Sequence, residues 1–115
     1  MDGKQNRKSL TAAYKEKRAL GGVAAVVCAA TGKRLLLSGA DLRGMQNRFG
    51  FSKATGSCVS PRLQSDWSRL GAGAFSFEVL ETLEQQPTQD AAAFRADVKA
   101  LEELWRERYN PEALY

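Results

Sequence analysis

The sequence predicts an α+β domain, a small three-stranded antiparallel sheet flanked by helices, with an extra helix at its N-terminus. Three features predict this class. Two apolar segments lie close together early in the chain, an alternating segment follows much later, and helical patterns separate and flank them. With 115 residues the chain can form one domain with a single modest core. We expect residues 1–20 to form a basic helical extension and residues 21–115 to form the α+β domain.

The first third of the chain is expected to hold a helix and a β-hairpin. Residues 4–18 combine lysines and arginines with a small apolar face, which is the pattern of a basic amphipathic helix, and Gly21–Gly22 ends it. Residues 23–29 are apolar on both faces, which indicates an interior strand. A tight turn over residues 30–33 then leads into an antiparallel strand over residues 34–38.

The next helix is expected after Asp41, a suitable N-cap residue. Three apolar residues at helical spacing form the face that we expect to contact the core. These residues are Leu42, Met45 and Phe49. Because Gly44 and Gly50 weaken a helix, its extent is left open, and a Ser/Gly/Ala-rich loop is expected over residues 52–60.

Ser60 followed by Pro61 indicates the start of another helix, because serine caps a helix and proline fits its first position. The apolar residues of this helix are Leu63, Trp67 and Leu70. Gly71 is expected to end it. Apolar and polar residues then alternate over residues 75–79, which predicts a third strand with one buried face.

The chain is expected to close with a polar linker over residues 84–90 and a long helix over residues 90–109. Apolar residues recur through this helix at helical spacing and form one wide stripe. The stripe consists of Phe94, Val98, Leu101, Trp105 and Tyr109. Asn110 and Pro111 end the helix.

Basic and acidic residues are distributed unevenly along the chain. The net charge is +4, but residues 1–72 hold 13 Lys and Arg against 4 acidic residues, whereas residues 73–115 hold 4 against 9. This pattern favours an electropositive surface that faces a polyanion, or self-association between opposite ends. Ordinary solvated helix faces are the simpler alternative.

Histidine is absent, and the only cysteines are Cys28 and Cys58. A Ser-His-Asp or Cys-His pair and a His-containing zinc site are therefore excluded, so any metal would be a hard cation held by carboxylates. The two cysteines fit neither a metal knuckle nor a disulfide framework. The N-terminus lacks the apolar core of a signal peptide, and no uncharged run is long enough to span a bilayer. We therefore expect a cytoplasmic protein that does not enter membranes.

Residues 63–81 resemble a segment of GIY-YIG nuclease domains in which a helix ending in D-W-x-x-x-G leads into a strand of the type F-x-F-E-V-L-E. Gly32–Lys33 in the hairpin turn and Asp41–Leu42 after it support the resemblance, which covers residues 22–115. The basic helix in front is similar to the N-terminal extension of a bacterial subgroup of small, stand-alone relatives. The resemblance implies the α+β fold already expected from the patterns.

Active members of this family are understood to cleave nucleic-acid phosphodiesters with one divalent cation. Two strand tyrosines and an arginine act around the scissile phosphate, and a glutamate on the last helix holds the metal. In this chain the corresponding reactive positions are apolar. They are Ala24 and Leu35 for the tyrosines, Leu37 for a nearby glycine, Met45 for the arginine, and Phe49 for a histidine or tyrosine. The resemblance therefore implies an endonuclease-like domain with a degenerate active site.

The family's glutamate has a counterpart in Glu102. On a helical wheel it lies about 60° from the centre of the apolar stripe, at the boundary where a ligand for Mg²⁺ or Mn²⁺ could face a cleft. The alternative is a solvated glutamate that pairs with Arg106 one turn later. One carboxylate without further ligands binds a hard cation poorly.

Three functions remain open. The first is a non-catalytic domain that binds DNA or RNA through phosphate contacts from its basic half. The expected contacts are Arg34, Arg43, Arg48, Lys53, Arg62 and Arg69. The second is a module that binds a protein partner or a second copy through the apolar former cleft or through its oppositely charged halves. The third is a residual nuclease that uses Glu102 and a relocated base.

Overall fold

The computed structural model describes residues 20–115, and the helix expected over residues 4–18 lies outside them. Three strands and three α-helices follow in the expected order. They are β1 (Leu20–Cys28), β2 (Arg34–Gly39), α2 (Leu42–Thr55), α3 (Gln64–Leu70), β3 (Phe75–Glu84) and α4 (Ala91–Arg106). Short 3₁₀ turns occupy Pro61–Leu63, Ala72–Ala74 and Pro111–Ala113. The predicted α+β class with a small antiparallel sheet is confirmed.

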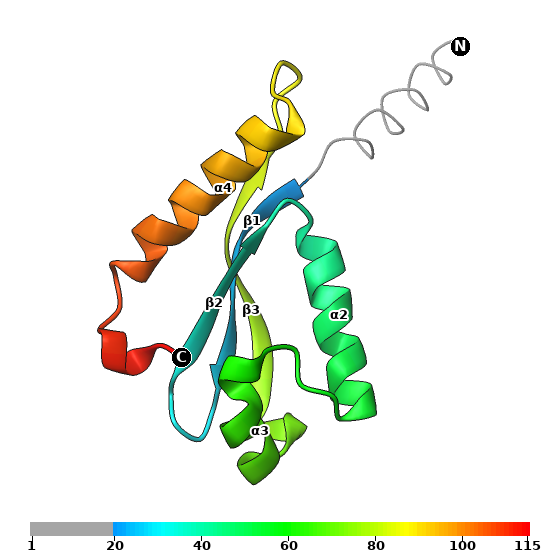
Figure 1. Ribbon diagram of the computed structural model, residues 1–115, viewed down its shortest axis with the longest axis vertical. Coiled ribbons are helices and arrows are strands. Elements are labelled where there is room, and N and C mark those ends of the chain that lie inside the picture. Colours follow the sequence, from blue (N-terminus) through cyan, green and yellow to red (C-terminus); the bar gives the residue numbers. More distant parts are fainter. Residues whose placement is uncertain (1–19) are drawn as a thin grey trace.

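The sheet has the order β2-β1-β3, and both pairings are antiparallel. β1 is therefore the central strand, and Val23 through Val26 are fully buried, as the run of apolar residues on both faces predicts. β2 and β3 are the two edges of the sheet (Figure 1). Near the start of β1 the pairing with β3 shifts by one residue between Val23 and Ala24, which marks a β-bulge.

Gly22 lies just before this bulge, where β3 comes close to β1. It pairs with Gly39 of β2 and Thr82 of β3, and its φ of +144° lies in a region that other residues rarely adopt. A Cβ atom at this position would collide with the carbonyl oxygen of Glu81 and lie 2.9 Å from the Cα atom of Thr82. β3 can therefore approach β1 this closely only because residue 22 is glycine.

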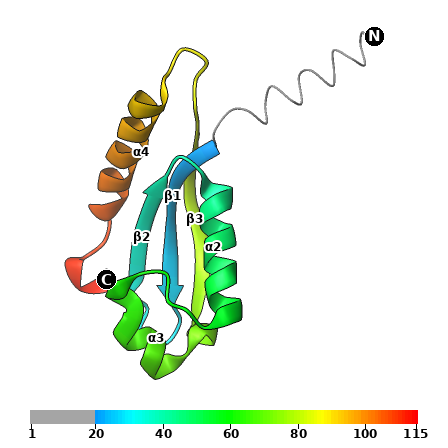
Figure 2. The same ribbon diagram turned by 45° about the vertical axis from the view of Figure 1, so that its right-hand side comes forward.

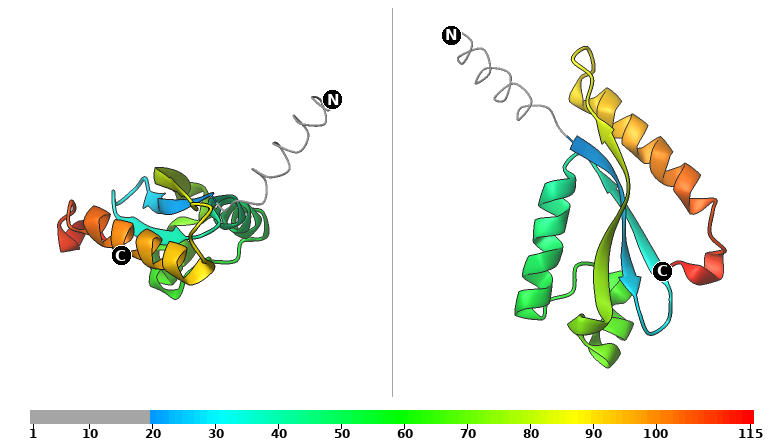
Figure 3. Two further views of the ribbon diagram at one scale, coloured as in Figure 1. Left: turned by 90° about the horizontal axis from the view of Figure 1, so that it is seen from above. Right: turned by 180° about the vertical axis from the view of Figure 1, so that it is seen from behind.

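Helices cover both faces of the sheet. Figures 1 and 2 show α4 on one side and α2 on the other, with α3 below, and Figure 3 shows the same layers from above and behind. α4 packs on β1 and β2, where its Phe94 and Val98 are buried. The main core lies on the opposite face, between the sheet, α2 and α3. Its buried residues are Val26, Cys28, Leu35, Phe49, Leu63, Trp67 and Phe75.

Several expected boundaries are wrong. β1 begins at Leu20 and not at residue 23, so Gly21 and Gly22 lie within the strand. The helix after Asp41 does not end near residue 52 but continues to Thr55, where Gly56 in the left-handed conformation ends it. Asp41 does act as its cap, with its carboxylate accepting a hydrogen bond from the Gly44 backbone N–H at 3.0 Å. The third strand extends to Glu84, well beyond residue 79. Only its start is buried, and Val79 is 44% exposed on this edge strand.

The last helix also differs from expectation. It ends at Arg106, and Tyr109 lies in the turn after it. The buried face of this helix runs through Phe94, Val98 and Glu102 at intervals of four residues, whereas Leu101 and Trp105 are only half-buried. The apolar stripe therefore does not mark the centre of the buried face. In the described part of the chain no helix is long and apolar enough to cross a membrane.

Candidate functional site

The positions that correspond to the family's reactive side chains lie on β1, β2 and α2. Ala24 is fully buried and packs with Leu42 and Met45, while Leu35 and Phe49 belong to the main core. Leu37 is half-buried and contacts both groups. These apolar side chains are closely packed against each other, so they stabilise the fold and offer no acid, base or nucleophile.

A pocket of about 230 Å³ lies beside these residues, between the edge strand β2 and α2. Five of its seven lining side chains are apolar. The lining residues are Val26, Leu37, Ser38, Met45, Arg48, Phe49 and Val59. Arg48 is exposed, so this pocket has an apolar floor and a cationic rim.

A second, larger hollow of about 510 Å³ lies on the other side of β2, against α4. Arg95 and Lys99 border it from successive turns of α4, and Glu102 follows on the next turn. Leu37 and Ser38 line both hollows. The two hollows therefore meet at one point of the edge strand, with cations on either side of it.

Glu102 is held by protein donors on both carboxylate oxygens. The Ser38 hydroxyl donates to Oε1 and the Arg106 guanidinium to Oε2, and Lys99 Nζ lies 3.5 Å from Oε1. The residue is only 5% exposed. Burial alone would raise the pKa of Glu102, but the hydrogen bonds from Ser38 and Arg106 and the charge of Lys99 outweigh burial and lower it. The expected pairing with Arg106 is present, but the alternative of a solvated glutamate is wrong.

This arrangement does not fit a divalent cation. Mg²⁺ can be held by one or two carboxylates together with waters, but residues 20–115 contain no cluster of three or more Asp, Glu, His or Cys residues, so Glu102 would have to serve without further protein carboxylates. Both oxygens of Glu102 already accept hydrogen bonds from protein donors, and two cations lie beside it. An incoming metal would have to displace Arg106 and overcome the charge of Lys99.

The six predicted phosphate contacts divide into two groups. Arg34 forms an ion pair with Glu78, Arg69 forms one with Asp66 at 2.7 Å, and Lys53 donates to the Phe75 carbonyl at 3.0 Å. The other three are exposed, and their side chains have no hydrogen bond or ion pair within the described part of the chain. They are Arg43, Arg48 and Arg62. The second group can bind an anion without losing a partner.

The prediction missed Arg95 and Lys99. Both lie in the half of the chain with a net negative charge, where the charge distribution predicts no binding surface for a polyanion. Their spacing does indicate a shared surface with Glu102, since residues 95, 99 and 102 fall on one side of a helix. Arg95 is exposed and unpaired among the described residues, and Lys99 contacts only Glu102.

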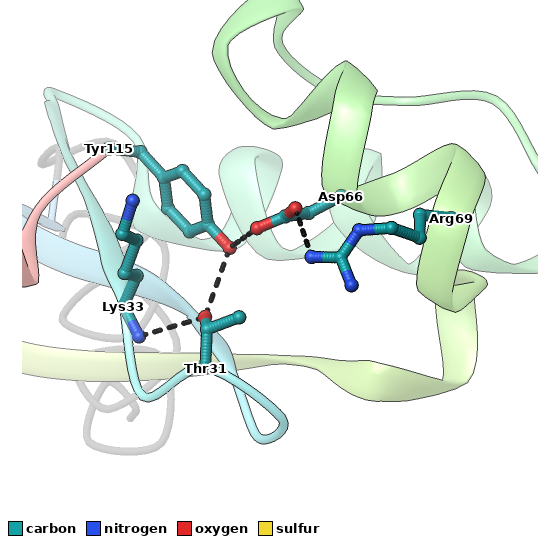
Figure 4. A network of polar contacts seen from close by, with 5 residues as sticks. All are labelled: Thr31, Lys33, Asp66, Arg69 and Tyr115. Carbon is teal, nitrogen blue, oxygen red and sulfur yellow. Dashed lines mark hydrogen bonds and ion pairs between the residues drawn. The ribbon is translucent and has the colours of Figure 1, made fainter.

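The C-terminal residues are joined to the hairpin and α3 by a polar network (Figure 4). The Tyr115 hydroxyl donates to Asp66 at 2.7 Å and lies 3.3 Å from the Thr31 hydroxyl. The Tyr115 backbone N–H also bonds the Arg34 carbonyl at 2.8 Å, beside the first residue of β2. Asp66 therefore has a structural role as the acceptor for Tyr115. Trp67 is structural too, because it is buried and its indole N–H donates to the Gly56 carbonyl at 3.0 Å.

Solved structures with the same fold are known. The catalytic domain of the homing endonuclease I-TevI matches with a TM-score of 0.58 and 19% identity, over 83% of this chain and 95% of that one. A variant of the I-TevI catalytic domain in which one glutamate is replaced by alanine matches with a TM-score of 0.56 and 16% identity, over 77% and 82%. No protein-family model and no curated protein matches the sequence. The chain therefore has a GIY-YIG-like fold.

Proposed function

We propose that this chain is a catalytically degenerate GIY-YIG endonuclease-like domain that binds nucleic acid without cleaving it. One observation carries the proposal. Glu102, the single reactive group that the resemblance retains, accepts a hydrogen bond from Ser38 and is paired with Arg106 and Lys99, whereas unpaired cations lie on both sides of the neighbouring edge strand. The surface thus offers positive charge to phosphates and no catalytic group.

Unpaired cations support the binding part of the proposal. Arg48 on α2 and Arg95 on α4 border the two hollows that meet at Leu37 and Ser38, and Lys99 lies next to Arg95. Each lysine or arginine that neutralises a phosphate releases counterions, so the affinity depends steeply on salt. Arg43 and Arg62 are further exposed cations that could extend the contact.

The loss of catalysis has a separate physical basis. Phosphodiester hydrolysis needs a base to activate water and a cation to stabilise charge on the phosphate. The positions that would supply these groups are apolar, namely Ala24, Leu35, Met45 and Phe49. Glu102 is paired with cations of the protein itself. A residual nuclease therefore ranks below a binding domain.

A salt series tests the proposal. Labelled single- and double-stranded DNA and RNA would be titrated with the full-length protein at increasing salt concentrations. We expect binding at low salt, with log K falling linearly against log salt and a slope that corresponds to several phosphate contacts. An absence of binding to all four ligands at low salt would contradict the proposal.

Matched charge variants locate the contact. Arg48→Gln and Arg95→Gln should each weaken binding and reduce the salt slope by about one unit, because each removes one phosphate contact. Arg108→Gln is the control, since Arg108 is stacked over the Trp105 ring at 4.2 Å and borders neither hollow. An equal effect of all three changes would mean that the binding surface lies elsewhere.

A second candidate function is a module for a protein partner or a homodimer. Phe51 on α2 is 68% exposed and Leu104 on α4 is 57% exposed, and large exposed apolar side chains are typical of interaction surfaces. Light scattering at increasing protein concentration distinguishes this candidate, since a mass that rises toward a dimer would favour it. A cytoplasmic location, expected from the composition, fits either function.

A further inference from the structure

The pocket between β2 and α2 differs from an ordinary phosphate-binding surface. Its floor consists of Val26, Leu37, Met45 and Phe49, whereas a site built only for phosphates would present donors and charges. Its volume of about 230 Å³ is below the roughly 300–1,000 Å³ of pockets that hold drug-sized ligands. The pocket therefore suits a single flat ring system.

One arginine without a partner in residues 20–115, Arg48, lies at the rim of the pocket. Arg48 is exposed and has no hydrogen bond or ion pair among the described residues. An arginine guanidinium both stacks on aromatic rings and pairs with phosphate, so it suits the junction between a base and its backbone. Val59 borders the same opening from the loop before α3, and it is half-buried.

The second hollow lies where the adjoining backbone would run. It shares Leu37 and Ser38 with the apolar pocket, and Arg95 and Lys99 border it from α4. A chain that crosses the edge strand at Leu37–Ser38 would thus meet an apolar pocket on one side and two cations on the other. This alternation of ring and phosphate is the chemistry of a nucleic-acid strand.

We infer that the pocket between β2 and α2 accepts one unstacked nucleobase, while Arg95 and Lys99 bind the adjacent phosphates. The inference rests on the proposed function and specifies its ligand class as single-stranded DNA or RNA. In a duplex every base is stacked and paired, so entry into the pocket would require flipping, which costs free energy. In a single strand the base is already free to turn out.

Fluorescence tests this directly. The probe is a single strand of about 12 nucleotides with one central 2-aminopurine, together with its duplex, and both are titrated with the full-length protein. We expect about tenfold tighter binding of the single strand, because one base–protein contact is worth about a factor of ten or more. The 2-aminopurine emission should rise on binding, since this base is quenched while it is stacked on its neighbours.

Two variants test whether the preference for single strands and the rise in emission come from the pocket. Val59→Trp fills the opening and should abolish both the preference for single strands and the rise in emission. Arg48→Gln changes an exposed residue and should reduce both, which keeps the test valid if the tryptophan variant misfolds by circular dichroism. Arg43→Gln is the matched control, since Arg43 is an unpaired arginine on the same helix that borders neither hollow. It should weaken single strand and duplex equally.

The outcomes separate this inference from the proposed function. Equal affinity for single strand and duplex without a rise in emission would overturn the pocket assignment and leave nucleic-acid binding in place. No binding to either ligand would overturn both. If poly-glutamate displaces the single strand and its own binding is lost in Val59→Trp, the pocket recognises an acidic peptide instead, which also overturns the inference.

Discussion

At the residue scale, the decisive feature is the state of Glu102. Its carboxylate is buried and accepts hydrogen bonds from Ser38 and Arg106, two groups that are far apart from each other in the sequence. A buried carboxylate that is fully paired is stable, but it is not free to bind a ligand. The residue that most resembles a catalytic group is therefore part of the packing between α4 and β2.

Glu102→Gln should lower the free energy of unfolding and weaken its dependence on pH. The folded state lowers the pKa of Glu102 below its ordinary 4.5, so the stabilisation is complete above that value and is lost as the pH falls below it. We expect a loss of about 1.5 kcal/mol at pH 7, typical of hydrogen bonds to a charged group. Urea unfolding between pH 7 and pH 3 measures both effects.

Glu103→Gln is the control for this change, because Glu103 is the exposed neighbour of Glu102. It should leave stability and its pH dependence nearly unchanged. If Glu102→Gln is as stable as the wild type at pH 7, the carboxylate is not held as described, and it would again be available to a metal.

Tyr115→Phe should loosen the attachment of the C-terminal residues. The change removes the hydroxyl that donates to Asp66, and this hydrogen bond is the largest reason why the pKa of Asp66 is lowered. We expect a lower Tm and an Asp66 pKa that returns toward 3.8, measured by NMR titration of the carboxylate. Tyr109→Phe should leave that pKa unchanged, since Tyr109 contacts Arg34 through its ring.

At the element scale, the bulge in β3 opposite Val23 and Ala24, and the N-cap of α2, set the shape of the site. After the one-residue shift, Ala24 pairs with Val79. Asp41 caps the start of α2, and Met45 and Phe49 of this helix are buried in the core. Gly22 therefore has a structural role in the sheet, where the close approach of β3 requires glycine.

Gly22→Ala should be among the most destabilising single changes in the sheet. It forces a non-glycine residue into a φ of +144° and places a Cβ atom against the β3 backbone. The strain alone costs about 1–3 kcal/mol, and the collision adds to it. Gly73→Ala is the control, because a Cβ there meets nothing within 4 Å and the residue has no positive φ. Equal stability of the two variants in urea unfolding would contradict the close approach of β3 to Gly22.

The elements that the sequence predicted best are those with strong local signals. The central strand and the start of α2 at Asp41 follow from a hydrophobic run and a capping residue, which act over a few residues. Ser60 does act as a cap, but of a 3₁₀ turn over Pro61–Leu63, and α3 begins only at Gln64. Helix and strand ends were less predictable, because Gly56 and the neighbouring layers decide them. The burial of Glu102 could not be predicted, since it depends on Ser38, 64 positions away.

At the scale of the whole molecule, the fold brings together charges that the sequence keeps apart. Arg48 comes from the basic half of the chain, while Arg95 and Lys99 come from the acidic half, yet all three lie beside the same edge strand. The division into a basic and an acidic half therefore does not describe the surface. The acidic residues of α4 are partly neutralised by their own neighbours, as Glu102 shows.

The central claim is that the protein binds nucleic acid without a metal and without cleavage. The most direct test is a binding gel with labelled DNA and RNA, run with EDTA and with excess Mg²⁺ or Mn²⁺, for the wild type and Glu102→Gln. We predict the same retarded complex with EDTA and no shortened product in any lane. A product that forms only with the metal, and disappears in Glu102→Gln, would contradict the claim and identify the protein as an active nuclease.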